Sequence, residues 1–287
     1  MGQAKARKRE GFPDALVDSW EADDCINFAV ALARITGWLL HVDWVVKSLP
    51  PHDNVTMDKL VPLRVYVQDN REGIFDVRGI KALSEFQDSK IAKRAKGVLR
   101  AARTPGGVLT RYYSEEKLSS LPLRSFPDEE KIAIAAEAIK ANPTFLERIP
   151  VRTKPCLPAY DAARYTFGRC ASYAEAMCEL TGLPPVAILA KKFSPMYESS
   201  PRASNGYFHS IVLHPDGMGE DSWGIARVED IAARFGVIEF ELSQSVYQDV
   251  VQNHRKESGD IYEEELSAAR DLISKYRNIA YVNFGAD

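Results

Sequence analysis

The sequence predicts an α+β protein made of two copies of one unit. Three observations support this prediction: a long internal repeat, apolar positions at helical spacing near the start of each copy, and strand-like runs after them. Each copy is expected to be a helix packed on an antiparallel sheet. The chain has 287 residues, enough for two ordinary domains.

The repeat is clearest around Cys25 and Cys170, which lie 145 residues apart. Residues 24–38 align with residues 169–183 and share the cysteine, two alanines and a Thr-Gly pair. Two further blocks keep the same offset, and they pair residues 64–67 with 209–212 and residues 76–80 with 221–225. Three blocks in the same order favour duplication over chance similarity between two short segments.

The elements of one copy follow from its periodicities. In the second copy Tyr173, Met177 and Leu180 recur at helical spacing after Cys170, and this pattern predicts a helix with one buried face. The helix is expected to end at Gly182, because glycine suits the left-handed position after a helix.

A short apolar run at residues 185–191 and a polar loop at residues 194–206 come next. Strands near residues 207–213 and 220–223, with a turn between them, should form a hairpin. Each copy is expected to end in an amphipathic helix, at residues 129–141 and 263–277. Acidic residues at Glu263–Glu265 would open the second of these helices. The first copy holds a basic, helix-prone insert, residues 90–103.

These features divide the chain into four parts. Residues 1–12 form a basic tail, residues 13–145 the first repeat lobe, residues 146–160 a linker and residues 161–287 the second lobe. The segment His254-Arg255-Lys256 is interpreted as a surface turn.

Composition excludes several function classes. The chain carries 37 Lys and Arg against 40 Asp and Glu, a net charge of −3, so nucleic acid is not expected as a partner apart from the basic tail. Four cysteines are too few for a disulfide framework, which favours a cytoplasmic location. No apolar run is long enough to cross a membrane. Motifs for phosphate loops, dinucleotides and paired-cysteine metal sites are absent from the sequence, so neither a cofactor nor a metal is expected.

The candidate catalytic residues are Cys170, His209 and Asp221. A thiol becomes a good nucleophile when a helix N-terminus or a positive neighbour stabilises its thiolate. Histidine can take and return the proton, and a carboxylate can hold the imidazole in one tautomer. The hairpin would bring His209 and Asp221 to neighbouring positions.

This order of a cysteine at a helix start, then His and Asp on successive strands, resembles the papain-like superfamily. That group includes transglutaminase-like enzymes and many bacterial and phage effector peptidases, deamidases and acyltransferases. The resemblance implies a thiol hydrolase or acyl transferase that acts on an amide or ester bond, with a protein or peptide as substrate. Members usually place an oxyanion-hole side chain upstream of the cysteine. No Gln stands there in this chain, and Tyr165 and Arg169 are the weak substitutes beside the Cys170 amide.

The first copy is expected to be catalytically degenerate. It keeps Cys25 and Asp76, but Arg64 replaces the histidine, and arginine cannot act as a general base. Arg64 could pair with Asp76 and still stabilise a Cys25 thiolate. A rescuing base would have to come from elsewhere, and His41 and His52 are the candidates.

Purely structural interpretations of these cysteines compete with the catalytic one. Free cysteines are often buried, and Cys170 could be a core residue of its helix. Cys178 is expected to pack in the core, and Cys156 in the linker has no partner motif. The alternative function is therefore an inactive pseudoenzyme that serves as a protein-binding or structural module.

Overall fold

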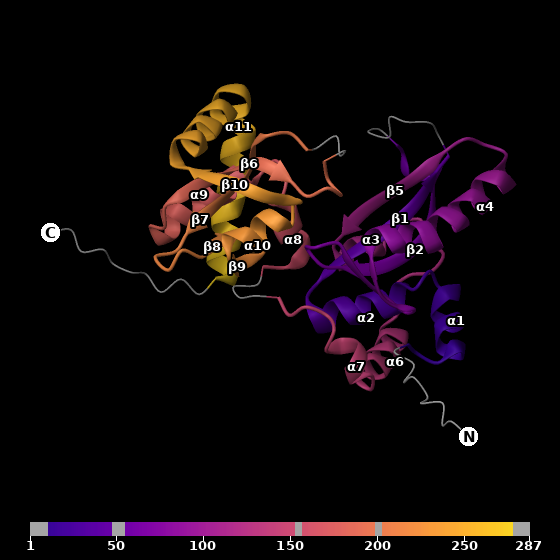
Figure 1. Ribbon diagram of the computed structural model, residues 1–287. Helices are drawn as coiled ribbons and strands as arrows, with labels where there is room; N and C mark the ends of the chain where they lie inside the picture. The colour runs from indigo at the N-terminus through magenta and orange to yellow at the C-terminus, as the bar shows by residue number, and fades with distance from the viewer. Residues whose placement is uncertain (1–10, 48–54, 153–156, 199–202, 278–287) are drawn as a thin grey trace, which may run out of the picture. The chain divides into compact units, whose positions relative to one another are not determined.

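The computed structural model describes residues 11–47, 55–152, 157–198 and 203–277. Contacts divide the chain into two units, Met1–Val151 and Arg152–Asp287. Each unit combines helices with one five-stranded antiparallel sheet (Figure 1), so the predicted α+β class is confirmed. The boundary between the two units falls within residues 146–160, the segment expected to be a linker. Most of the basic tail, His52 and Cys156 lie outside the described residues.

The first unit has the strand order β4-β3-β2-β1-β5. Its strands are β1 (Leu39–Val46), β2 (Leu60–Gln68), β3 (Gly73–Asp76), β4 (Gly79–Ala82) and β5 (Gly107–Tyr113). Its α-helices are α1 (Asp14–Ala22), α2 (Ile26–Thr36), α3 (Leu83–Phe86), α4 (Ala92–Ala102), α5 (Glu115–Leu118), α6 (Glu129–Lys140) and α7 (Pro143–Leu146). A 3-10 turn at Met57–Lys59 precedes β2, and a π-helical segment, Gln87–Ile91, leads into α4.

The second unit has the strand order β10-β6-β7-β8-β9. Its strands are β6 (Pro185–Phe193), β7 (Gly206–Leu213), β8 (Gly219–Asp221), β9 (Gly224–Ala226) and β10 (Val237–Ser243). Its helices are α8 (Ala159–Arg164), α9 (Cys170–Thr181), α10 (Val228–Ala233) and α11 (Gln244–Tyr276). The hairpin expected around residues 214–217 is present as β7 and β8, and β9 adds a strand that the sequence did not indicate.

The two sheets share one topology: β6 to β10 occupy, in turn, the places of β1 to β5. In each unit the helix at the repeated cysteine packs against the last long helix, α2 against α6 and α9 against α11. Both cysteine helices end at a glycine in the left-handed region, Gly37 with φ 71° and Gly182 with φ 73°. The duplication indicated by the sequence therefore has a counterpart in topology.

Apolar side chains between sheet and helices form the cores. In the first unit, β1 is buried along its whole length, and α2 is buried from Ile26 to Leu32. The insert predicted at residues 90–103 is helical. Ile91 and Ala95 on its apolar side pack against residues of the sheet. In the second unit, Ile188 and Ile211 of neighbouring strands pack with Ile231 of α10.

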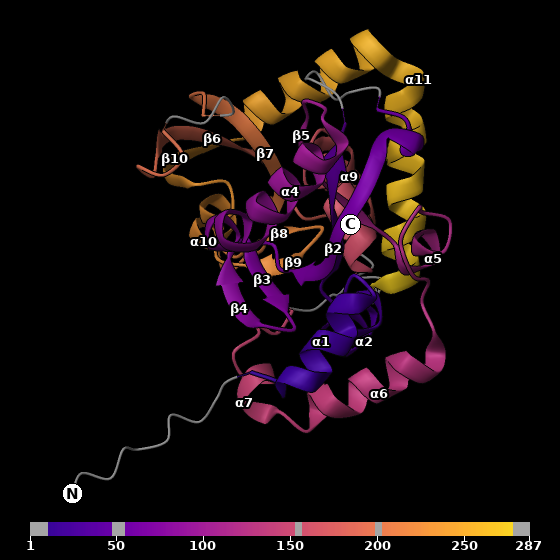
Figure 2. The same ribbon diagram turned by 90° about the vertical axis from the view of Figure 1, so that its right-hand side faces the viewer.

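Helix α11 corrects two sequence-based expectations. It begins at Gln244 rather than near Glu263, and it bends at Ser258, whose φ and ψ are −150° and 46° (Figure 2). The segment at residues 254–256 is therefore helical and not a surface turn. A charged side chain of this segment is paired within the fold, because Arg255 donates hydrogen bonds to Glu175 and Glu263. In the described parts of the chain, neither this helix nor any other is both long and apolar enough to cross a membrane.

Candidate active site

Helix α9, labelled in Figure 1, begins at Cys170. The thiol is therefore carried by the first turn of this helix. Gly168, two residues earlier, has φ 76°, a left-handed conformation that lets the chain turn into the helix. The first amide groups of a helix have no partner within it and favour negative charge nearby. Cys170 is thus placed where a thiolate is stabilised, and only 5% of its surface is exposed.

His209 and Asp221 come together across the β7–β8 hairpin. His209 Nε2 lies 3.1 Å from Asp221 Oδ2, and both side chains are almost fully buried. The strands pair Val212 with Glu220, so His209 reaches Asp221 diagonally and not from the directly opposite position. A carboxylate only accepts hydrogen bonds, so Nε2 carries the proton in this contact. Nδ1 is buried without another well-formed hydrogen bond and is the nitrogen free to serve the thiol.

Asp221 is held ionised by its neighbours. Burial alone would favour its neutral form, but the charge of Arg234 and the hydrogen bond from His209 outweigh burial and lower its pKa to about 2. Arg234 Nη1 donates to both carboxylate oxygens, at 2.9 and 3.1 Å, and the amide of Trp223 donates to Oδ1 at 2.9 Å. Sequence inspection missed Arg234, which follows α10 and is only 13 residues from Asp221.

Cys170 and His209 shift each other's pKa in the buried site. Burial disfavours the thiolate, yet the charge of His209 lowers the pKa of Cys170 below its ordinary value. The same pairing works on the imidazole: burial disfavours its charge, but Cys170 and Asp221 raise the pKa of His209 to about 9. Each of the three residues therefore favours the charged form of its neighbour.

Tyr207 is a fourth member of the site that sequence inspection missed. Its hydroxyl lies 3.3 Å from Cys170 Sγ and 3.0 Å from Ser210 Oγ. Burial, followed by the negative charge of Cys170, raises the pKa of the phenol, which keeps its proton and can donate a hydrogen bond to the thiolate. The available signal was its place two residues before His209 in the same strand.

Replacing Tyr207 with phenylalanine is expected to slow alkylation of Cys170 at pH 6 by about tenfold. A hydrogen bond to a charged group contributes about 1.5–3 kcal/mol, and about 1.4 kcal/mol corresponds to a factor of ten. The ring remains, so packing is preserved. The measurement is the rate of iodoacetamide labelling, with Tyr160→Phe as the control. Equal rates for the wild type and Tyr207→Phe would show that the hydroxyl does not support the thiolate.

The two side chains expected to serve as oxyanion donors point elsewhere. The hydroxyl of Tyr165 donates to the backbone oxygen of Glu265 at 3.4 Å, and Arg169 forms an ion pair with the Glu265 carboxylate at 3.0 Å. Both are thus engaged by α11. The backbone amide of Cys170 and the Tyr207 hydroxyl remain as donors beside the thiol.

Aromatic rings cover the site. The imidazole of His209 packs on Phe235, with 4.8 Å between ring centroids, and Phe167 meets Phe235 edge-on at 5.5 Å. Phe167 is 61% exposed and lies three residues before the cysteine. These rings help to shield the imidazole from solvent, and His209 is fully buried.

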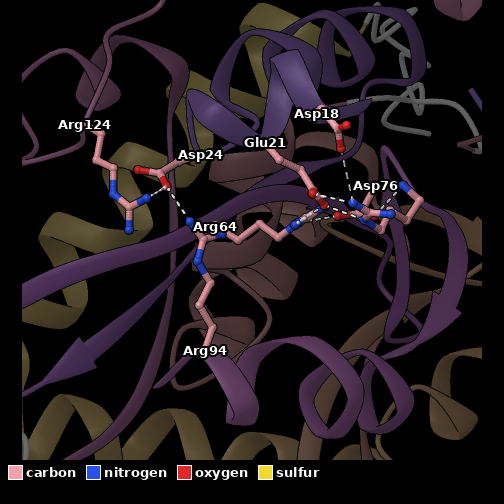
Figure 3. Close-up of polar contacts among 8 residues, drawn as sticks. Asp18, Glu21, Asp24, Arg64, Asp76, Arg94 and Arg124 are labelled. Carbon is pink, nitrogen blue, oxygen red and sulfur yellow. Dashed lines mark hydrogen bonds and ion pairs between the residues drawn. The ribbon is translucent and has the colours of Figure 1, made fainter. Parts of the chain in front are cut away.

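In the first unit the corresponding residues Arg64 and Asp76 also meet, as Figure 3 shows. Arg64 Nε donates to Asp76 Oδ2 at 2.5 Å, and its Nη1 donates to Glu21 at 2.8 Å. Cys25 precedes α2 with φ 64°, and its amide donates to the oxygen of Trp20. Burial raises the pKa of Cys25 to about 12, an effect that Arg64 only partly offsets. Arg64 favours the Cys25 thiolate, but burial and the neighbouring carboxylates of Asp76 and Glu21 outweigh it, so the thiol keeps its proton.

The remaining candidates play no part in either cluster. His41 stacks on Tyr66, and burial lowers its pKa to about 3, so it is neutral. Cys178 is half-buried rather than part of the core. In the described ranges, no group of three or more His, Cys, Asp and Glu side chains is placed to hold a metal ion.

Comparisons with protein-family models, with curated proteins and with solved structures find no match to this chain. The site geometry therefore carries the functional argument.

Proposed function

We propose that the second unit is a thiol hydrolase or acyl transferase that acts on an amide or ester bond. The observation that carries the proposal is the buried relay in which Asp221 holds His209 and His209 stabilises the thiolate of Cys170. The proposal extends to the fold, as two tandem lobes of papain-like and transglutaminase-like character with an inactive first lobe. Its substrate is a protein or peptide, by resemblance to that superfamily.

In the first half-reaction the Cys170 thiolate attacks the carbonyl carbon, and the carbonyl oxygen takes the negative charge. The Cys170 amide and the Tyr207 hydroxyl are the donors nearest to that oxygen. His209 then gives its Nδ1 proton to the leaving amine or alcohol, the carbon–nitrogen or carbon–oxygen bond breaks, and a thioester remains. Asp221 keeps the imidazole oriented throughout.

In the second half-reaction the neutral His209 accepts a proton from the incoming nucleophile. Water yields a carboxylic acid, so peptide cleavage or glutamine deamidation results. An amine yields a new amide, which is transamidation. In each case the thiolate leaves and the imidazolium is restored, so the enzyme ends in its starting protonation state. This cycle requires a free thiol, so the proposal includes a reducing, cytoplasmic location for the protein.

The test is the pH dependence of alkylation of the whole protein by limiting iodoacetamide. We expect Cys170 to be labelled selectively, with a half-maximal rate at a pH below the ordinary thiol value of about 8.5. The imidazolium is lost as the pH rises through about 9, so turnover of a substrate should fall there while labelling does not. Cys25 is the internal control, because its pKa of about 12 should keep it unlabelled at every pH in the series.

Two results would contradict the proposal. One is labelling of Cys170 that begins only above the ordinary thiol pKa, and the other is labelling that begins only on unfolding. Either would favour the alternative, a pseudoenzyme that serves as a binding module.

A further inference from the structure

The first unit contains a cavity of about 470 Å³ beside its degenerate cysteine. Four cationic side chains line it, Arg64, Arg78, Lys90 and Arg94, together with the carboxylates of Asp18 and Glu21. Glu21 is ionised, since its hydrogen bond from Arg78 outweighs burial and lowers its pKa to about 2. Among the lining residues the cations therefore outnumber the carboxylates by two, while Asp76 and Asp24 pair with Arg64 and Arg94 from outside the lining.

Several of these cations are incompletely compensated. Arg64 is 5% exposed, and its Nη2 is buried without a hydrogen-bond partner although Nε and Nη1 are both bonded. Arg94 reaches the Asp24 carboxylate only at 3.4 Å and shares it with Arg124, as Figure 3 shows. Burial, followed by the charge of Arg124, lowers the pKa of Arg94.

The cavity is made from positions at which the two copies differ. Arg64 stands where the second unit has His209, and Arg78 stands where it has Trp223. A contact from this position to the segment before the cysteine is present in both units, with Arg78 bonding Glu21 in the first unit and Trp223 bonding Thr166 in the second. Lys90 comes from the π-helical segment and Arg94 from α4, and these belong to the insert that only the first copy carries.

We propose that this cavity binds a small molecule through a phosphate group. Arginine forks and an ammonium group converging on one cavity match the several terminal oxygens of a phosphate, which accept from more donors than a carboxylate does. Arg64 and Arg78 line the cavity from the repeated part of the unit, and Lys90 and Arg94 line it from the insert. The site is independent of the chemistry proposed for Cys170.

The experiment is calorimetric titration of the full chain with inorganic pyrophosphate at low salt, where electrostatic contacts are least screened. We expect the wild type to bind, and Lys90→Ala and Arg94→Ala each to weaken binding by about tenfold, the loss of one charge-assisted hydrogen bond. Lys93→Ala is the matched control, because Lys93 is exposed on the same helix and does not line the cavity. It should bind as the wild type does.

A second titration with citrate tests the class of ligand. Weaker binding of citrate than of pyrophosphate supports a phosphate site, whereas tighter binding that is lost in the same variants overturns that assignment. The site itself is overturned if the wild type does not bind pyrophosphate, or if Lys93→Ala weakens binding as much as Lys90→Ala. Unfolding midpoints of all variants, measured in parallel, show that each is folded.

Discussion

Replacing His209 with alanine is expected to slow iodoacetamide labelling of Cys170 at pH 6 by about a hundredfold. An adjacent opposite charge shifts a pKa by about one to three units, and each unit changes the thiolate fraction tenfold below the pKa. Burial then acts on Cys170 without the imidazolium that now offsets it. The sign follows from this loss: the thiol pKa rises, so the labelling profile moves to higher pH.

The control for this variant is His254→Ala. His254 stacks on Tyr262 and contacts neither Cys170 nor Asp221 among the described contacts. Its removal should leave the labelling profile of Cys170 unchanged. If His209→Ala were labelled as fast as the wild type at pH 6, the thiolate would not depend on the imidazole, and the proposed relay would be wrong.

Replacing Arg234 with alanine is expected to lower the free energy of unfolding by about 3–5 kcal/mol, the usual result of leaving one member of a buried ion pair alone. Arg234 and Asp221 are 7% and 2% exposed, so water cannot replace the lost partner. The hydrogen bonds from His209 and Trp223 to Asp221 remain and set the lower end of this range. Urea unfolding, followed by circular dichroism, measures the effect.

Arg227→Ala is the matched control, because Arg227 pairs with Asp230 at the surface, where the arginine is 67% exposed. Such pairs contribute about 1 kcal/mol or less. The double variant Arg234→Ala with Asp221→Asn should recover part of the loss, since it removes the unpaired charge. A loss for Arg234→Ala no larger than that for Arg227→Ala would mean that the Asp221 carboxylate does not depend on the arginine.

The sequence predicted the cysteine helices and the β7–β8 hairpin well because their signals are local. Helical spacing after Cys170 and a turn between two apolar runs need no knowledge of the rest of the chain. Helix α11 was underestimated for the opposite reason. Its first half is polar, and Arg255 is placed by a glutamate of another helix, Glu175, which no pattern within residues 244–262 reveals.

The two cysteines at equivalent repeat positions show where local pattern ends. The order of cysteine, basic residue and aspartate, and the replacement of histidine by arginine in the first copy, can be read directly from the aligned residues. The charge state of each thiol cannot be read from the aligned residues. Burial opposes ionisation of Cys25 and Cys170 alike, and the outcome depends on which charges lie within a few ångströms. Electrostatic energy depends on distance and burial, and only the tertiary structure fixes these two quantities. It places Arg234 and Tyr207 beside the second site and Glu21 beside the first, and none of these three residues belongs to the aligned repeat blocks.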